Sequence, residues 1–275
     1  MKRGARARPS AALDCISDAA TGNATGKTRG RTGEFSSALK LGLYEAIFHR
    51  RDIREFLPDP IPDAVLARVL IAAHHAASVG FTQPWDFIVI RDRARRKRVR
   101  EVFESERAKN ADHFSGARRE KFLSLKLEGI LDAPLNLLVT CTPGRFSKSV
   151  LGKVSIREVE IYSACLAVEN IWLAARAEGL GVGWVSILRN DALVEIFNIP
   201  RGVIPLAYLC VGSVKDFPLR PLLASAGWAK RLPPRELIHL DSWTGAPTRS
   251  DRLVREIENA SIWRQIFPDE ARHDR

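Results

Sequence analysis

The hydrophobic residues of the chain follow two spacings, one typical of helices and one typical of strands. Apolar residues three or four positions apart predict helices over residues 36–50, from Pro62 or Asp63 to Ala73, and over 158–178 and 190–197. Apolar stretches rich in β-branched residues predict strands at residues 85–91, 135–142, 184–188 and 204–214. Helices and strands alternate along the chain, so the predicted class is α/β or α+β.

Two further helical patterns refine this picture. The segment from Glu158 to Glu178 is the most hydrophobic, and its apolar residues occupy more than one face. This predicts a helix at the centre of the fold or of a dimer interface. A charged helical region is predicted from Arg93 to about Asp132, with an interruption near residues 114–116. The glycine-rich residues 179–183 are predicted to end the central helix.

The 275 residues are enough for one or two domains with a substantial core. Residues 1–34 have little to bury, which predicts a disordered basic extension. An organelle transit peptide, or a start codon assigned too far upstream, fits this segment equally well. One domain is predicted over residues 35–245, followed by a charged extension over 246–275. No apolar run approaches the length of a membrane span, and no apolar core follows the basic start.

The formal net charge of +11 invites a nucleic-acid interpretation. The positive charge, however, is concentrated in the first 34 residues and in the arginine-rich run 91–100. No zinc knuckle, arginine–aromatic alternation or helix-turn-helix pattern accompanies either segment. A basic surface also attracts small phosphorylated molecules. Binding to nucleic acid is therefore kept only as a remote alternative.

The cysteines and histidines do not predict a metal site. The four cysteines contain no C-x-x-C pair, and three of them lie in strongly apolar stretches: Cys141, Cys165 and Cys210. They are expected to be thiols in a reducing cytoplasm. His74 and His75 are adjacent and point to different faces of a helix, and no H-x-x-x-H spacing occurs.

The segment from Arg50 to Phe56 carries the strongest chemical signal. Arg50, Arg51 and Arg54 lie within five residues, and a guanidinium group donates paired hydrogen bonds to phosphate oxygens. Asp52 stands among them, and its arginine neighbours are expected to keep it ionised and to lower its basicity. From there it could take a proton from a bound molecule. The alternative is a charged, solvated helix end.

Two loops could line a ligand site. Residues 78–85 combine the hydroxyl of Ser78 and the amide of Gln83 between a helix and a strand, which fits either a rim for a heteroaromatic ligand or a loop with capping residues. Residues 179–183 do not match a dinucleotide fingerprint, because they follow a helix and not a strand. Their glycines would let the backbone approach a flat ligand closely.

The order of these segments resembles the nitroreductase superfamily of FMN proteins. R-R-x-x-R-x-F at residues 50–56 is followed by S-V-G-F-x-Q-P-W at 78–85, a hydrophobic helix, and G-L-G-V-G-W-V-S-I at 179–187. Within the superfamily, the chain is most similar to the flavin destructase (BluB type) branch of 5,6-dimethylbenzimidazole synthases. Ser124 to Ile130 and Gly227-Trp228 add to this likeness, which spans residues 35–245. The deciding position is Asp52, where ordinary nitroreductases commonly carry serine.

The resemblance implies an α+β fold in which a mostly antiparallel sheet is wrapped by helices in an intertwined homodimer, with FMN at the dimer interface. It also implies a set of flavin-binding residues: Arg50, Arg51, Arg54, Ser78, Gln83, Leu125, Leu127, Gly183 and Trp184. Leu125 or Leu127 would close the site, and the loop around Gly183 would cover the isoalloxazine. Asp52 is the expected general base, and Ser186 the expected second catalytic residue.

The activity that the resemblance implies is the oxygen-dependent fragmentation of reduced FMN to 5,6-dimethylbenzimidazole and erythrose 4-phosphate. The benzimidazole serves as the lower ligand of vitamin B12. In this branch reduced FMN is a substrate and O2 a co-substrate, and a separate NAD(P)H flavin reductase is the expected partner. The alternative on the same fold is an NAD(P)H-dependent FMN nitroreductase or a related oxidoreductase.

Overall fold

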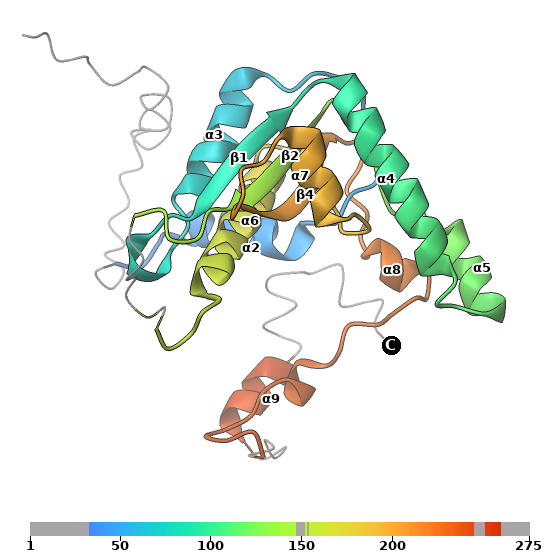
Figure 1. The fold of residues 1–275 in the computed structure, drawn as a ribbon. Helices are drawn as coiled ribbons and strands as arrows, with labels where there is room; N and C mark the ends of the chain where they lie inside the picture. The colour runs from blue at the N-terminus through green and yellow to red at the C-terminus, as the bar shows by residue number, and fades with distance from the viewer. Residues whose placement is uncertain (1–32, 147–151, 153, 245–250, 260–275) are drawn as a thin grey trace, which may run out of the picture. The chain divides into compact units, whose positions relative to one another are not determined.

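The computed structural model describes residues 33–146, 152, 154–244 and 251–259 (Figure 1). The disorder predicted for residues 1–34 falls almost wholly outside these ranges, as does most of the extension predicted for 246–275. Contacts within the chain separate residues 1–40 from residues 41–275, and the sheet and the candidate site belong to the second unit.

The elements follow the alternation that the sequence predicts. The helices of the described residues are α2 (Ser37–His49), α3 (Asp63–His74), α4 (Arg93–Ala111), α5 (Gly116–Ser124), α6 (Val159–Ala177), α7 (Asn190–Phe197), α8 (Leu222–Ser225) and α9 (Arg252–Glu258), with short 3-10 turns η1 (Val79–Phe81) and η2 (Pro234–Glu236). The strands are β1 (Trp85–Ile90), β2 (Leu135–Cys141), β3 (Leu180–Val185) and β4 (Ile204–Ser213).

The four strands form one sheet in the order β1-β2-β4-β3, and every neighbouring pair is antiparallel. β2 and β4 lie in the middle, so they are buried on both faces and carry nearly continuous apolar sequence. β3 is at an edge of the sheet, where its outer backbone groups need partners from elsewhere. The predicted α+β class with an antiparallel sheet is confirmed.

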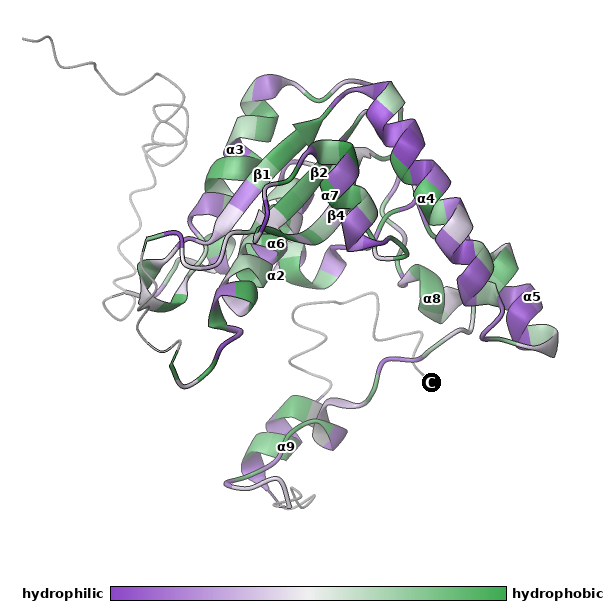
Figure 2. Ribbon diagram, viewed as in Figure 1, coloured by the Kyte–Doolittle hydropathy of each residue, from purple (hydrophilic) through white to green (hydrophobic). Residues whose placement is uncertain are grey.

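Each face of the sheet packs against its own pair of helices (Figure 1). Leu137 and Leu209 point to the face that α3 and α6 cover, while Leu138 and Tyr208 point to the face that α4 and α7 cover. This division follows from the two-residue period of a strand, which sends successive side chains to opposite faces. In Figure 2 the central strands β2 and β4 are mostly hydrophobic, whereas α4 is mostly hydrophilic.

Helix α6 confirms the prediction of a central helix. Ala164, Ala167, Ile171 and Ala175 are all fully buried against the sheet. The three alanines bring the helix close to the strands. On its other side, α6 leaves Tyr162 and Leu166 about half exposed, at 56% and 49%.

Two predicted boundaries are wrong. The helical region expected to reach Asp132 ends at Ser124, because Leu125 adopts an extended conformation and begins an irregular segment. The loop expected at residues 179–183 is strand from Leu180 onward, so Gly183 lies inside β3. The described part of the chain has no helix both long and apolar enough to cross a membrane.

Candidate functional site

The predicted arginine segment lies along the free edge of β3. Asp52 forms a parallel bridge with Val182, and the amide of Ile53 donates a 2.9 Å hydrogen bond to the Val182 carbonyl. Residues 52–54 therefore supply backbone partners that the edge strand would otherwise lack. This pairing brings the carboxylate of Asp52 and the guanidinium of Arg54, which follow α2, onto the end of β3.

Gly183 makes this close approach possible. A Cβ atom at position 183 would overlap the carbonyl oxygen of Ile53 and crowd the guanidinium of Arg54. At Gly181 a Cβ would likewise collide with Val214 and Ile53. The sequence predicted that these glycines let the backbone approach a flat ligand. In the structure, the space beside them that a side chain would fill is occupied by residues 53 and 54.

Asp52 and Arg54 together hold the backbone of Trp184. The Trp184 amide donates to Oδ1 of Asp52 at 2.8 Å, and the Trp184 carbonyl accepts from Nη2 of Arg54 at 2.8 Å. The two side chains also pair with each other through both carboxylate oxygens. Both polar backbone groups of one edge residue are thus satisfied by a single ion pair, which we call the Asp52–Arg54 clamp.

Burial raises the pKa of Asp52 above its usual 3.8. Arg54, the amide of Trp184 and Arg50 act in the opposite direction. The expectation that the arginines lower the basicity of Asp52 is therefore right in the sign of their effect but wrong in the net result. Nearly half of the Asp52 side chain, 47%, is still exposed. A carboxylate with raised basicity and an open side suits proton abstraction from a bound molecule.

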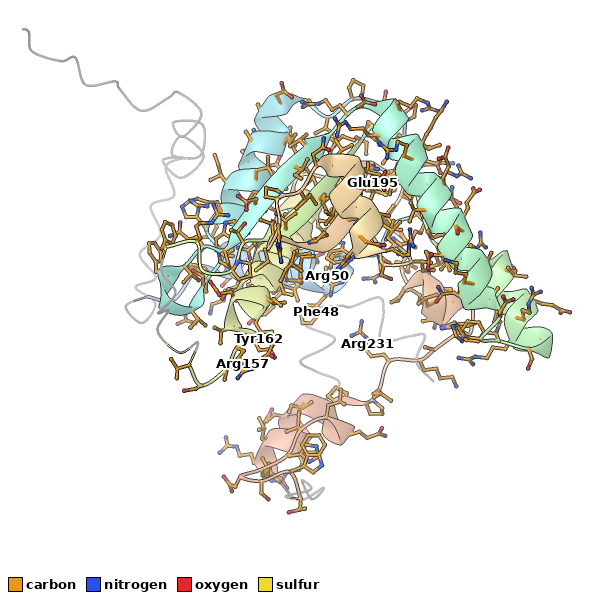
Figure 3. All side chains as sticks on the ribbon, in the orientation of Figure 1. Phe48, Arg50, Arg157, Tyr162, Glu195 and Arg231 are labelled. Carbon is orange, nitrogen blue, oxygen red and sulfur yellow. The ribbon has the colours of Figure 1, made fainter. Side chains whose placement is uncertain are left out.

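The other two predicted arginines have different surroundings. Arg50, labelled in Figure 3, donates from Nε to Glu169 on α6 at 3.2 Å. Its guanidinium lies 5.4 Å from the ring centre of Trp172, and 39% of its side chain is exposed. Arg51 is buried, and its guanidinium donates to backbone carbonyls that include those of Phe48 and Leu219. Arg50 has an open guanidinium, whereas Arg51 ties the segment to Leu219 in the stretch after β4.

The loop that carries Ser78 and Gln83 is anchored on α6. The backbone amide of Val79 donates to the hydroxyl of Ser163 at 3.1 Å, and Ser163 is buried within the helix. Within the loop, the amide of Gln83 donates to the hydroxyl of Ser78 at 3.1 Å. Ser78 is thus a loop-stabilising residue in this structure, and binding of a ligand by it stays a prediction.

Two residues of the same loop adopt a left-handed backbone conformation. Phe81 has a φ of 54° and Gln83 a φ of 43°, both uncommon for residues with a side chain. The side-chain amide of Gln83 donates to the carbonyl of Phe81 at 3.1 Å, which helps to hold this geometry. Strained backbone that its surroundings hold in place is concentrated at functional sites.

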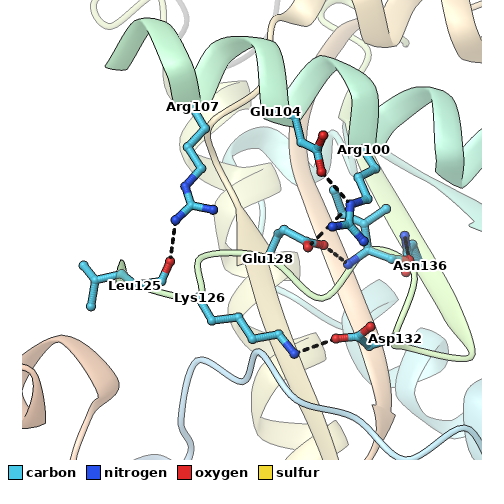
Figure 4. A network of polar contacts seen from close by, with 9 residues as sticks. Arg100, Glu104, Arg107, Leu125, Lys126, Glu128, Asp132 and Asn136 are labelled. Atoms are coloured by element: carbon cyan, nitrogen blue, oxygen red, sulfur yellow. Dashed lines mark hydrogen bonds and ion pairs between the residues drawn. The ribbon is translucent and has the colours of Figure 1, made fainter. Parts of the chain in front are cut away.

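The segment with Leu125 and Leu127 is held by charged residues of α4 (Figure 4). Nη2 of Arg107 donates to the carbonyl of Leu125 at 2.9 Å, and a carboxylate oxygen of Glu128 accepts from the amide of Ile130 at 2.6 Å. Leu125 is buried and Leu127 half-buried. Their predicted role as a closing segment is not tested by this arrangement.

This segment nevertheless reaches the arginine segment. A Cβ atom at Gly129 would collide with the ring of Phe56 and touch the carbonyl oxygen of Arg54. The irregular stretch after α5 therefore packs against the residues that follow the Asp52–Arg54 clamp. Three segments far apart in the sequence meet here: the arginine segment, the stretch after α5, and β3.

Ser186 is exposed and directly follows β3, two residues beyond Trp184. The sequence predicted it on a short strand, whereas the strand ends at Val185. A pocket of about 280 Å³ lies between α4 and α7, and none of the predicted site residues lines it.

Sequence reasoning missed three polar residues of α6 that anchor neighbouring segments. Glu169 pairs with Arg50, and Ser163 holds the Ser78 loop. Glu160 is almost fully buried, and its carboxylate accepts from the amide of Gly144 at 2.7 Å. All three are polar residues in the most hydrophobic helix of the chain, and that contrast is the signal that could have identified them.

Comparison with known proteins gives the family. The model of the nitroreductase family matches residues 47–213, which contain the arginine segment and all four strands. The chain belongs to the nitroreductase family. It is 38% identical to the 5,6-dimethylbenzimidazole synthase of Rhodospirillum rubrum over 205 residues, which cover 74% of this chain and 97% of that enzyme.

Solved structures agree on the fold. A BluB-like flavoprotein from Clostridium difficile superimposes with a TM-score of 0.55 and 21% identity, over 73% of this chain and 99% of that one. Iodotyrosine deiodinase bound to FMN and 3-iodo-L-tyrosine also gives a TM-score of 0.55, with 24% identity over 65% of this chain and 94% of that one.

Proposed function

We propose that this protein fragments reduced FMN with O2, releasing 5,6-dimethylbenzimidazole and erythrose 4-phosphate. The observation that carries the proposal is the likeness to the Rhodospirillum synthase along nearly its whole length. A second observation supports it: Asp52, the residue that separates this branch from ordinary nitroreductases in the sequence, lies beside β3 with an open side. The benzimidazole would become the lower ligand of vitamin B12.

The residues near Asp52 suit a flat, phosphorylated ligand. Arg50 offers a half-exposed guanidinium to the phosphate, the ligand for which its planar fork is suited. Gln83 and Ser78 are partly exposed on an anchored loop and would line the ring, together with Gly183 and Trp184. Leu125 and Leu127 would exclude water from the site.

Reduced flavin supplies the electrons that O2 consumes in this reaction. Asp52 takes a proton from the sugar-alcohol chain, and its raised pKa makes it a better base than an ordinary aspartate. The Trp184 amide and Arg54 fix the direction of its carboxylate before the substrate arrives. Ser186, exposed at the end of β3, orients the reacting part of the substrate or passes on a proton.

The site requires a second copy of the chain. Asp52 is 47% exposed and Arg50 39%, so one chain leaves these side chains open to solvent. Exposed apolar side chains on two helices supply a contact face for a homodimer: Leu43, Tyr44, Ile47, Tyr162 and Leu166. FMN bound where two chains meet would be shielded from water by both.

A separate NAD(P)H flavin reductase supplies the reduced substrate, since the sequence has no recognisable nicotinamide-binding segment. Neither nucleic acid nor a membrane is a partner in this proposal. Cys165 and Cys210 are free thiols, which fits the reducing cytoplasm as the place of the reaction.

The proposal is tested by mixing purified protein with reduced FMN in air and identifying the products by mass. Wild-type protein is expected to form 5,6-dimethylbenzimidazole. Asp52→Asn should form about a hundredfold less, because general-base catalysis typically contributes that much or more. Asp63→Asn is the matched control, since Asp63 is also paired with an arginine but is 87% exposed at the start of α3. Reoxidation of FMN without fragmentation in the wild type would refute the proposal.

The family model alone also fits an NAD(P)H-dependent nitroreductase. That function predicts a purified protein that keeps yellow FMN and consumes NAD(P)H steadily with a nitroaromatic or a quinone. The same preparation decides between the two, because the fragmentation reaction destroys the flavin and needs no nicotinamide once FMN is reduced.

A further inference from the structure

The three arginines of the segment were all expected to bind the flavin, but their hydrogen bonds set Arg54 apart. A guanidinium group has five N–H donors. In Arg54, Nη1 donates to Oδ1 of Asp52 at 2.8 Å and to the carbonyl of Ile53 at 3.0 Å. Nη2 donates to Oδ2 of Asp52 and to the carbonyl of Trp184. The fifth donor, Nε, is buried and has no acceptor among the described residues.

Both Nη groups of Arg54 already donate to acceptors within the chain, and the unpaired Nε is buried, so no exposed donor of Arg54 is left for a phosphate. Binding a phosphate through a guanidinium requires two adjacent N–H groups directed at its oxygens. Only 11% of the Arg54 side chain is exposed, compared with 39% for Arg50. Within the described part of the chain, the terminal nitrogens of Arg50 have no hydrogen-bond acceptor. Their N–H groups can therefore donate to the oxygens of a phosphate.

We propose that Arg54 is a positioning residue, which fixes the direction of the Asp52 carboxylate on β3, and that it does not bind the phosphate of the substrate. The inference rests on the proposed function, because it assigns a role around the same base. It also explains why Gly183 is needed: a side chain there would push the guanidinium of Arg54 out of its place. Of Arg50 and Arg54, only Arg50 then binds the phosphate.

The two roles are separated by a substrate that lacks the phosphate. Reduced riboflavin carries the same ring and sugar-alcohol chain as reduced FMN. If Arg54 acts through Asp52, Arg54→Gln lowers kcat/KM for both substrates by the same factor, to within about twofold. Arg50→Gln should lower kcat/KM for reduced FMN about tenfold more than for reduced riboflavin, since one charge-assisted hydrogen bond is lost with the phosphate.

The acid limb of the pH–rate profile gives a second readout. The charged and titratable groups that act on Asp52 are Arg54 and Arg50, and Cys210 of β4 also interacts with it electrostatically. Because Arg54 lowers the pKa of Asp52, Arg54→Gln should move the acid limb to higher pH. Arg54→Lys keeps the positive charge and should return the limb toward its wild-type position. Arg91→Gln, an exposed arginine paired with Asp63, should leave the profile unchanged.

Binding of the oxidised flavins separates this inference from the proposed function. Titration of protein fluorescence with FMN and with riboflavin needs no turnover, so it stays informative if no benzimidazole forms. Arg54→Gln should keep the preference for FMN over riboflavin, and Arg50→Gln should lose it. An FMN-selective loss in Arg54→Gln, or an acid limb that does not move, would overturn the positioning role. A thermal melt checks folding, and Arg54→Lys takes the same binding test if Arg54→Gln is unfolded.

Discussion

The three arginines of the arginine segment have different roles because their partners come from distant parts of the chain. Arg50, Arg51 and Arg54 lie within five positions, yet one is half-exposed, one is held by backbone carbonyls and one is paired with Asp52. The sequence suffices to predict that this segment is chemically important. It could not separate the three roles, because the acceptors of Arg54 include a carbonyl 130 positions away, that of Trp184.

Gly183 tests the packing of this segment. In Gly183→Ala the new methyl group would overlap the carbonyl of Ile53, so residues 52–54 would have to move away from β3. We expect a loss of about 1–3 kcal/mol in the free energy of unfolding, the usual range for overpacked sites. Chemical denaturation measures it, with Gly42→Ala as the control because a Cβ there has open space. Equal stability of both variants would contradict the close approach.

Asp52 gives the protein a pH dependence of defined sign. Its pKa is raised in the folded state, so activity that needs the carboxylate should fall as the pH drops through a value above 3.8. The raised pKa also stabilises the folded protein at low pH, and this contribution to stability is lost as the pH rises through the folded-state pKa. Comparing the acid limb and the melting temperature of the wild type with those of Asp52→Asn measures both effects. A limb at or below 3.8 would show that burial does not control this carboxylate.

At the level of elements, the hydrophobic periodicity predicted the ends of most helices and strands. It failed at the ends that are set by contacts with distant parts of the chain. The patterns predicted α3, α6, α7, β1, β2 and β4 within about two residues of their observed ends. The start of β3 was missed because glycines normally weaken strands, whereas here they admit Ile53. The helix predicted to reach Asp132 stops at Ser124, where Arg107 holds the carbonyl of Leu125.

Helix α6 should contribute strongly to stability through its buried face. Ile171 is fully buried between the helix and the sheet, so Ile171→Ala removes three carbons and leaves a cavity. The expected cost is about 2–5 kcal/mol of unfolding free energy. Ile71→Ala on α3, where the side chain is 54% exposed, should change it by less than about 1 kcal/mol. Similar losses in urea denaturation would mean that α6 is not central to the core.

The whole molecule combines a complete core with an open candidate site. Both faces of the sheet are covered by helices, yet α2 and α6 leave apolar side chains exposed, and Asp52 and Arg50 are open to solvent. The dimer was expected from resemblance, and this exposed face gives it a physical reason. Composition alone could not locate that face, since the apolar residues of α6 lie on more than one side.

Leu166→Asp tests the dimer. A carboxylate on the 49% exposed position of α6 would be buried without a partner if a second copy covers this face. Light scattering coupled to gel filtration should then show a dimer for the wild type and a monomer for the variant. Ile71→Asp on α3 is the control, and it should remain a dimer. A wild-type monomer at every concentration would contradict the proposal that two chains complete the site.

The central claim is that Asp52 acts on the sugar-alcohol chain of the flavin. A crystal structure of the protein with oxidised FMN measures this directly. The account predicts an Asp52 carboxylate oxygen within hydrogen-bond reach of a ribityl hydroxyl, at roughly 2.6–3.2 Å. It also predicts that Arg50 binds the phosphate and that Arg54 remains paired with Asp52. A flavin bound with Asp52 turned away from the ribityl chain into solvent would contradict it.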